Sequence, residues 1–308
     1  MSELVKATGL YRYYGKHCAV KDLSFSLNKG EVLGFLGANG AGKTTTMQML
    51  CGNLAPSAGE IYINGFDLLK KPQQAKLALG YLPDTPPLYK DLSVDEFLHY
   101  CAQLHRVSKP QIQKVVKSAV ERCGLYDVSN RLIVNLSKGY QQRVGIAQAI
   151  LHNPEVIILD EPTVGLDPIQ IKEIRSLIKE LGTEHGIILS THILPEVQES
   201  CSHVQIIHQG ELVLKETVAG LNQQMGSSRI QLTTRKAVDI NKLNAIDAVT
   251  NIETQVEGQY LIHHQSTANP LEALTEIVIA HGWGLEEISP VKRSLEDVFI
   301  NLTNSSKK

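Results

Sequence analysis

The segment 37–45 has the residue types and spacing of a phosphate-binding loop. It satisfies G-x-x-x-x-G-K-[ST] at every fixed position, and its predicted binding residues are Gly37, Asn39, Gly40, Ala41, Gly42, Lys43, Thr44 and Thr45. The glycines allow the backbone to turn tightly, so successive N–H groups can point at phosphate oxygens. Lys43 adds a positive charge that can reach the β- and γ-phosphates, and Thr44 offers a hydroxyl to Mg²⁺. The segment therefore predicts a site for the phosphates of a nucleotide together with Mg²⁺.

Two adjacent carboxylates, Asp160 and Glu161, follow the apolar segment 156–159. If this segment is a strand of a parallel sheet, both carboxylates lie at the carboxyl edge of the sheet, beside the phosphate-binding loop. Asp160 suits Mg²⁺, directly or through water. Glu161 suits a general base that orients a water molecule beside the γ-phosphate. An Asp-Glu pair is also a common turn signal, so the functional interpretation depends on the loop at 37–45.

A further helix start is predicted at Ser137, ahead of the helical segment 144–151. Serine is a favoured N-cap residue, and the free N–H groups and positive end of a helix attract an anion. From these residues alone, a capped helix without a ligand is the better explanation.

A sheet of apolar strands must position these residues. Strands are predicted at 32–36, 156–159, 187–189 and 204–207, with helices at 45–50 and 170–181. Short strand-like segments dominate residues 1–83, whereas helical periodicity runs from 93 to 151. Apolar strands joined by helices predict an α/β fold with a parallel sheet covered on both faces.

A change of pattern after residue 220 predicts a second domain. A polar linker at 222–228 is followed by strand, helix, two strands, helix and strand, at 229–234, 241–245, 251–256, 259–263, 270–280 and 285–288. The order βαββαβ is that of a small ferredoxin-like α+β domain. A last amphipathic helix is predicted at 295–302.

Composition narrows the class of protein. The formal net charge of −2 over 308 residues gives no electrostatic reason to expect a nucleic-acid partner. The five cysteines are scattered without zinc-site spacing, which indicates reduced thiols in the cytosol. The N-terminus has no apolar signal segment, and no stretch approaches the ~20 apolar residues of a membrane span. Work at a membrane would therefore require a partner.

Several motifs, in chain order, together resemble the nucleotide-binding subunit of an ABC transporter. They are the phosphate-binding loop, Leu136-Ser137-Lys138-Gly139-Tyr140-Gln141-Gln142, Leu159-Asp160-Glu161-Pro162, Gly165-Leu166-Asp167 and Ser190-Thr191-His192. The Leu-Ser-Lys-Gly-Tyr sequence and the tail Leu295-Glu296-Asp297-Val298-Phe299 are more similar to the type-2 exporter branch. The resemblance implies a P-loop NTPase (RecA-like) core with a helical insert at about 85–151. The nucleotide-binding domain would occupy residues 1–220 and the accessory domain 221–308.

The resemblance also implies roles for individual residues. Glu161, His192 and Lys43 would be catalytic, and His192 would contact the γ-phosphate and help hold the water near Glu161. Tyr14 would stack on the adenine, although Tyr11 and Tyr13 lie close by in the sequence. Thr44, Asp160 and Asp84 would hold Mg²⁺, with Asp84 standing where the family usually has glutamine. Other histidines are interpreted as surface or core residues.

The site implied by the resemblance is shared between two subunits. The signature residues Ser137, Lys138, Gly139, Tyr140 and Gln141 would complete the ATP site of another subunit, and Asp167 would lie in the loop that crosses between them. Lys138 and Tyr140 replace the Gly and Gln of the commonest signature.

The function implied is ATP hydrolysis, with ATP and Mg²⁺ bound, by a subunit that powers a separate transmembrane permease, most simply an exporter. The subunit would lie at the cytoplasmic face of the membrane, held by the permease. The helical insert and the loop 84–92 would form the docking face.

Three alternatives are weaker. A soluble ABC ATPase of translation or DNA repair usually carries two cassettes or a long coiled coil, and this chain has one cassette and no long heptad run. A regulatory module conflicts with the intact Lys43, Asp160, Glu161 and His192. A GTPase would need a guanine-reading Asn-Lys-x-Asp motif, whereas the similar stretch Asn28-Lys29-Gly30-Glu31 ends in glutamate.

Overall fold

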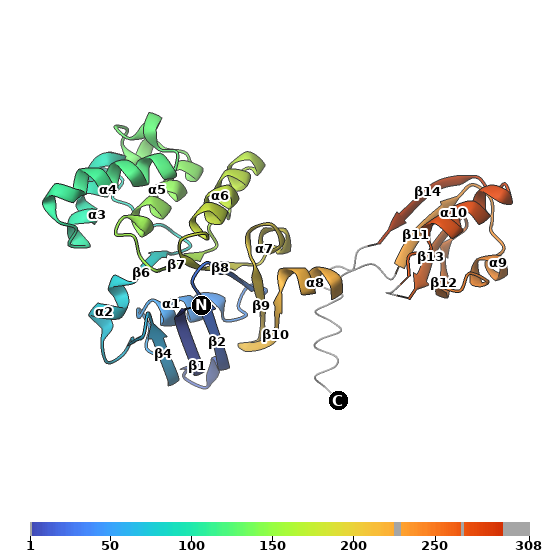
Figure 1. Ribbon diagram of the computed structural model, residues 1–308, viewed down its shortest axis with the longest axis horizontal. Helices are drawn as coiled ribbons and strands as arrows, with labels where there is room; N and C mark the ends of the chain where they lie inside the picture. Colours follow the sequence, from blue (N-terminus) through green and yellow to red (C-terminus); the bar gives the residue numbers. More distant parts are fainter. Residues whose placement is uncertain (1, 225–228, 266–267, 292–308) are drawn as a thin grey trace. The chain divides into compact units, whose positions relative to one another are not determined.

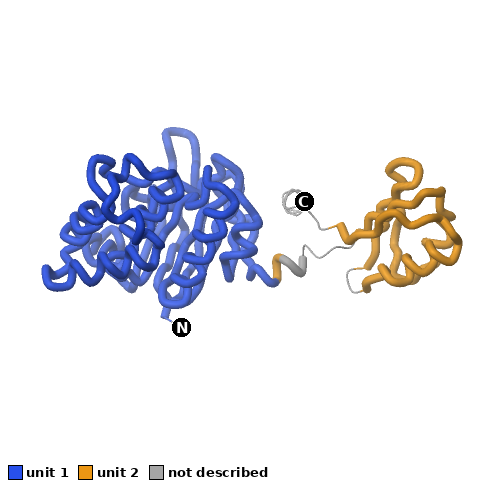
Figure 2. The backbone as a smooth tube through the Cα atoms, turned by 90° about the horizontal axis from the view of Figure 1, so that it is seen from above, with its two compact units in different colours: residues 1–219 blue, residues 220–308 orange. Residues whose placement is uncertain are grey.

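The computed structural model describes residues 2–224, 229–265 and 268–291. The chain divides into two compact units, residues 1–219 and 220–308 (Figure 2). Within the described ranges, no helix is both long and apolar enough to cross a membrane.

The centre of the first unit is a six-stranded sheet in the order β10-β9-β3-β8-β7-β6. Its strands are β3 (Val32–Leu36), β6 (Leu79–Leu82), β7 (Val156–Asp160), β8 (Gly186–Thr191), β9 (His203–His208) and β10 (Glu211–Thr217). All pairs are parallel except β9 with β10. Every residue of β3, β7 and β8 is buried, as expected for strands covered on both faces. The predicted α/β core is confirmed.

A second, antiparallel sheet has the order β2-β1-β4-β5. Its strands are β1 (Glu3–Tyr14), β2 (His17–Asn28), β4 (Ala58–Ile63) and β5 (Phe66–Asp67), and the short helix α2 (Pro72–Leu77) follows. Helix α1 (Lys43–Leu50) packs between the two sheets (Figure 1), where Met47 shares one apolar core with Phe25 of β2 and Ile188 of β8. This core fixes the helix that begins directly after the phosphate-binding loop.

A helical subdomain covers another part of the central sheet (Figure 1). It contains α3 (Val94–Leu104), α4 (Lys109–Arg122), 3-10 turns at Tyr126–Val128 and Ile133–Asn135, and α5 (Lys138–Ile150). Helix α3 begins with a capping box, because Ser93 Oγ accepts from Glu96 N and the Glu96 carboxylate accepts from Ser93 N. Phe97, Val116 and Ile146 bring the three helices into one core. The helical insert therefore lies where the sequence predicts it.

Helix α6 (Pro168–Leu181) connects β7 to β8, and α7 (Leu194–Ser200) connects β8 to β9, whereas α8 (Val218–Gln224) follows β10. Helix α6 begins two residues before the predicted start, because Asp167 caps it and Pro168 occupies its first position. The sequence analysis did not predict the short helices α2, α7 and α8.

The second unit contains β11 (Arg229–Thr234), α9 (Ile240–Asn244), β12 (Val249–Val256), β13 (Gln259–His264), α10 (Leu271–Ala280) and β14 (Leu285–Pro290). The strands form an antiparallel sheet in the order β12-β13-β11-β14. Ile230, Ile262 and Leu274 form part of its buried core. The predicted ferredoxin-like βαββαβ arrangement is confirmed, whereas the helix predicted at 295–302 falls outside the described residues.

Candidate active site

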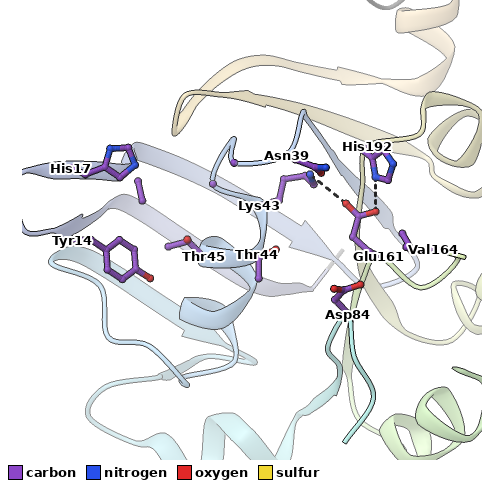
Figure 3. Close-up of a pocket in the computed structure, with 13 residues that line it drawn as sticks. Tyr14, His17, Asn39, Lys43, Thr44, Thr45, Asp84, Glu161, Val164 and His192 are labelled. Atoms are coloured by element: carbon purple, nitrogen blue, oxygen red, sulfur yellow. Dashed lines mark hydrogen bonds and ion pairs between the residues drawn. The ribbon is translucent and has the colours of Figure 1, made fainter. Parts of the chain in front are cut away.

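The candidate site lies at the carboxyl ends of β3, β7 and β8, where loops leave the parallel sheet (Figure 3). A pocket of about 490 Å³ opens there, a size typical of a ligand site. Ten predicted site residues line it: Tyr14, Asn39, Gly40, Gly42, Lys43, Thr44, Thr45, Asp84, Glu161 and His192. The chain thus brings together residues from five segments that are far apart in its sequence.

The phosphate-binding loop depends on glycine at two positions. Gly42 has a φ of +106°, and a Cβ there would lie 2.6 Å from the carbonyl oxygen of Ala19. Gly37 has no room for a side chain either, because a Cβ would lie 2.5 Å from the carbonyl oxygen of Ile207. The loop is therefore held against two strands, and its backbone leads directly into the N-terminus of α1 at Lys43.

The Lys43 side chain is buried, with 5% of its surface exposed. Its Nζ donates to the carbonyl oxygens of Gly37 at 2.8 Å and Ala38 at 3.3 Å. The same atom lies 3.3 Å from Oε1 of Glu161. The ammonium group therefore joins the loop to the carboxylate at the end of β7.

Glu161 is held in an unusual backbone conformation. Its φ is +49°, a left-handed value that is uncommon for a residue other than glycine, and its N–H donates to the carbonyl oxygen of Ser190 at 3.1 Å. Oε2 of Glu161 lies 2.9 Å from Nδ1 of His192 (Figure 3). The His192 side chain is 42% exposed and that of Glu161 11%. The turn after β7 thus aims the Glu161 carboxylate at the pocket and at the loop after β8.

Asp160, the last residue of β7, directly precedes Glu161 and is almost fully buried. Oδ1 accepts a hydrogen bond from Ser190, whereas the buried Oδ2 has no hydrogen-bond partner among the described residues. Burial is the main cause that raises the pKa of Asp160, and the charges of Glu161 and Asp84 raise it further. A buried carboxylate oxygen with no donor, close to two other acidic groups, is suited to a cation.

The structure does not bring the signature residues to this pocket. Ser137 caps α5 by accepting from Tyr140 N at 3.4 Å, and Lys138, Gly139, Tyr140 and Gln141 form the first residues of that helix. Among the described residues that line the pocket, none comes from 137–141. Asp167 also lies apart and caps α6, accepting from Ile169 N at 3.0 Å and Gln170 N at 2.9 Å.

Three lining residues, His17, Ala19 and Val164, were not predicted. The register of the β1–β2 hairpin pairs His17 with Tyr14, so His17 reaches the same side of the pocket. The only sequence signal was the short turn that follows Tyr14. The guanidinium of Arg12 lies over the ring of Tyr14, 4.9 Å from the ring centroid, in a cation–π contact. The predicted site residues Gly37, Ala41 and Asp160 are not among the residues that line the pocket.

A glycine-rich loop between a strand and a helix, with paired carboxylates at the end of another parallel strand of the same sheet, defines a P-loop nucleotide-hydrolysing domain. A family model described as ABC transporter matches residues 20–164. The chain is 33% identical over 311 residues to the bacitracin transport ATP-binding protein BcrA of Bacillus licheniformis, and the match covers 98% of each chain.

Two further comparisons indicate the same family of proteins. The linearmycin resistance ATP-binding protein LnrL of Bacillus subtilis is 33% identical over 308 residues, which cover 97% of this chain and 98% of that protein. The solved structure of cbiO1 from Clostridium perfringens, part of the ABC transporter complex cbiONQ, has 30% identity and a TM-score of 0.65. This similarity covers 72% of the present chain and 91% of cbiO1.

The chain therefore belongs to the family of ABC transporter ATP-binding proteins. Its activity is the hydrolysis of ATP, which powers a separate membrane permease. The family resemblance inferred from the motifs is confirmed, and the soluble alternative is not favoured.

Proposed function

We propose that Lys43, Glu161 and His192 carry out ATP hydrolysis in this pocket. The observation that carries the proposal is the direct linkage of the three side chains, with the Glu161 carboxylate between Lys43 Nζ at 3.3 Å and His192 Nδ1 at 2.9 Å. Glu161 accepts a hydrogen bond from the attacking water and takes up its proton as the bond to the γ-phosphorus forms. The bond between the γ-phosphorus and the bridging oxygen breaks, giving ADP and phosphate. The Lys43 charge offsets the negative charge that develops on the phosphate oxygens.

The loop backbone binds the phosphates through Asn39, Gly40, Gly42, Thr44 and Thr45. These residues line the pocket at the start of α1, where free N–H groups and the positive helix end favour an anion. Tyr14 and His17 lie at the end of the pocket away from Glu161 and His192 (Figure 3), and Tyr14 is 46% exposed. Tyr14 is thus available to stack on the adenine.

The residues present fit Mg²⁺. Asp160 has a buried carboxylate oxygen with no donor in the described part of the chain, Thr44 offers a hydroxyl, and Asp84 adds a carboxylate at the pocket wall. Bound Mg²⁺ would neutralise charge on the transferred phosphate. Asp84 is shorter than the glutamine usual in the family, so we propose that it acts on the ion through water.

The ATP site is proposed to be completed by a second subunit. Support comes from the exposed start of α5, where Ser137 offers a hydroxyl and Lys138 a positive charge. Neither residue lines the pocket of its own subunit. Two subunits arranged head to tail would place each α5 start over the ATP held by the other. Loss of the γ-phosphate would remove these contacts and weaken the dimer.

We propose that the permease docks beside the loop 84–92 of the helical subdomain. A groove there is lined by Cys51, Tyr81, Pro83, Pro87 and His105, among others. Tyr89 and Tyr100, which are 55% and 40% exposed, pack edge to face with ring centroids 5.5 Å apart. Docking would hold the subunit at the cytoplasmic face of the membrane. The names of BcrA and LnrL support export as the direction of transport.

The full chain co-expressed with its permease tests this proposal. We expect the chain to sediment with membranes only when the permease is present, and ATP hydrolysis to be lost in K43A. K29A is the matched control, because it makes the same substitution at a lysine that does not line the pocket, and it should leave hydrolysis unchanged. A K43A variant that hydrolyses ATP at the parental rate would exclude the proposed site, and a chain that never joins the membrane fraction would exclude the docking proposal.

A further inference from the structure

A buried carboxylate joins the loop that follows β7 to the end of β8, next to the residues with proposed catalytic roles. Glu196, in α7, has 1% of its surface exposed. Its Oε1 accepts a hydrogen bond from the hydroxyl of Thr163, and its Oε2 accepts one from Thr191 Oγ1 at 2.6 Å. Thr163 lies two residues after Glu161, and Thr191 immediately precedes His192. One side chain therefore joins the loop after β7 to the last residue of β8, directly before His192.

Both hydroxyls are themselves buried and have fixed partners. Thr163 is 3% exposed and Thr191 is 0% exposed. Thr191 Oγ1 also accepts from Ile193 N at 3.1 Å, so this hydroxyl is held from two sides. A carboxylate away from water needs hydrogen-bond donors, and here the two threonines supply them. The bridge is therefore costly to break once the loops are folded.

The only cation near Glu196 among the described residues is Arg175 of α6. Its Nη2 lies 4.0 Å from Oε1 of Glu196, whereas its Nη1 donates to the exposed Glu199 at 2.8 Å. Arg175 makes its shorter contact with Glu199, so the threonine hydroxyls are the close partners of Glu196. Glu199 consequently provides a matched comparison: a glutamate of the same helix, with the same arginine, that contacts neither threonine.

We infer that Glu196 is a positioning residue for ATP hydrolysis. The inference rests on the proposed roles of Glu161 and His192. These two side chains touch at 2.9 Å across the pocket, but they extend from separate loops beyond the ends of β7 and β8. Glu196 holds the loops at one separation and thereby sets the distance between Glu161 and His192. Because a displacement of about 1 Å can cost on the order of 10²-fold in rate, this restraint bears directly on turnover.

The first test compares E196A with E199A in the full chain. We expect E196A to lower kcat by about 10²-fold while the Kd for ATP changes less than about twofold, because Glu196 does not line the pocket. E199A should keep the parental kcat. E196Q should recover most of the lost rate, because an amide can still accept from one hydroxyl and donate to the other. Parental turnover in E196A, or equal losses in E196A and E199A, would overturn the inference.

A second pair of variants keeps the inference testable if E196A folds poorly. T163V and T191V each remove one hydroxyl while they conserve volume, and each should lower kcat without weakening ATP binding. The double variant E196A/T191V should be no slower than E196A alone, because both changes break the same bridge. If the two effects on kcat multiply, Glu196 and Thr191 act independently and the inference is wrong.

E161Q separates this inference from the proposed function. If E161Q hydrolyses ATP at the parental rate, the role of Glu161 is wrong whatever E196A does. If E161Q is inactive but E196A is fully active, only the positioning role fails. In an E161Q background, E196A should cause little further loss, because it acts through the residue already removed.

Discussion

The carboxylate of Glu161 bridges two functional groups, with Oε2 2.9 Å from Nδ1 of His192 and Oε1 3.3 Å from Nζ of Lys43. Three segments distant in sequence thus meet at one acidic side chain. Our proposal that Glu161 acts as the general base rests on this arrangement.

We expect E161Q to bind ATP but to turn it over at least about 10²-fold more slowly, because the amide cannot take up the proton of water. Hydrolysis would no longer remove the γ-phosphate, so the ATP-bound dimer should persist. Sizing chromatography with ATP and Mg²⁺ should show a two-subunit peak that is absent with ADP. A variant with unchanged turnover would remove Glu161 from the mechanism.

Tyr14 should contribute to recognition of the base. We expect Y14A to raise the Kd for ATP about tenfold, since stacking on a base contributes roughly 1–3 kcal/mol. Binding of inorganic tripolyphosphate should not change. Y13A is the matched control, because Tyr13 has nearly the same exposure, 47% against 46%, but does not line the pocket. Equal effects of Y13A and Y14A would contradict the assignment, as would weaker tripolyphosphate binding in Y14A.

The cap that Asp167 provides for α6 should be measurable as stability. D167A leaves the N–H groups of Ile169 and Gln170 without their acceptor, and we expect it to lower the free energy of unfolding by about 1 kcal/mol. D167N should be close to parental, because asparagine caps equally well. Urea unfolding of the first unit, followed by far-ultraviolet circular dichroism, measures the difference. If D167N hydrolyses ATP more slowly at normal stability, Asp167 acts beyond capping.

His152 should make the first unit sensitive to acid. Its ring stacks on His105 with centroids 4.0 Å apart, and its Nε2 lies 2.9 Å from the carbonyl oxygen of Leu79. Burial, and to a smaller extent the neighbouring His105, lower the pKa of His152 from its ordinary 6.5 to about 4.

The unfolded chain therefore binds this proton more readily than the folded chain. The stability contributed by neutral His152 is fully present above pH 6.5 and is lost as the pH falls toward 4. At pH 5 the loss reaches about 2 kcal/mol. We expect H152Q to lose less stability than the parent between pH 7.5 and pH 5. H281Q, which changes an exposed histidine of the second unit, should show the parental pH dependence. Identical pH curves for H152Q and the parent would show that His152 does not titrate in this way.

The sequence alone was sufficient for features that depend on consecutive residues. The loop at 37–45 has its glycines, lysine and threonine in a single run, and the apolar strands β3, β7 and β8 were predicted to within two residues at each end. Burial on both faces leaves such strands almost without polar residues, so their pattern is visible without a structure. The βαββαβ order of the second unit could be predicted because each of its strands and helices has its own hydrophobic periodicity in the sequence.

The tertiary structure decided which of these residues meet. His17 enters the pocket because a hairpin pairs it with Tyr14, and Glu196 of α7 reaches both Thr163 after β7 and Thr191 at the end of β8. No local pattern marks either contact, since a histidine in a strand and a glutamate in a short helix are ordinary surface residues by type. The sequence therefore determined the family, and it predicted the phosphate-binding loop. The distances among Lys43, Glu161 and His192, and the buried bridge behind them, required the fold, because contacts between distant segments depend on how strands and helices pack.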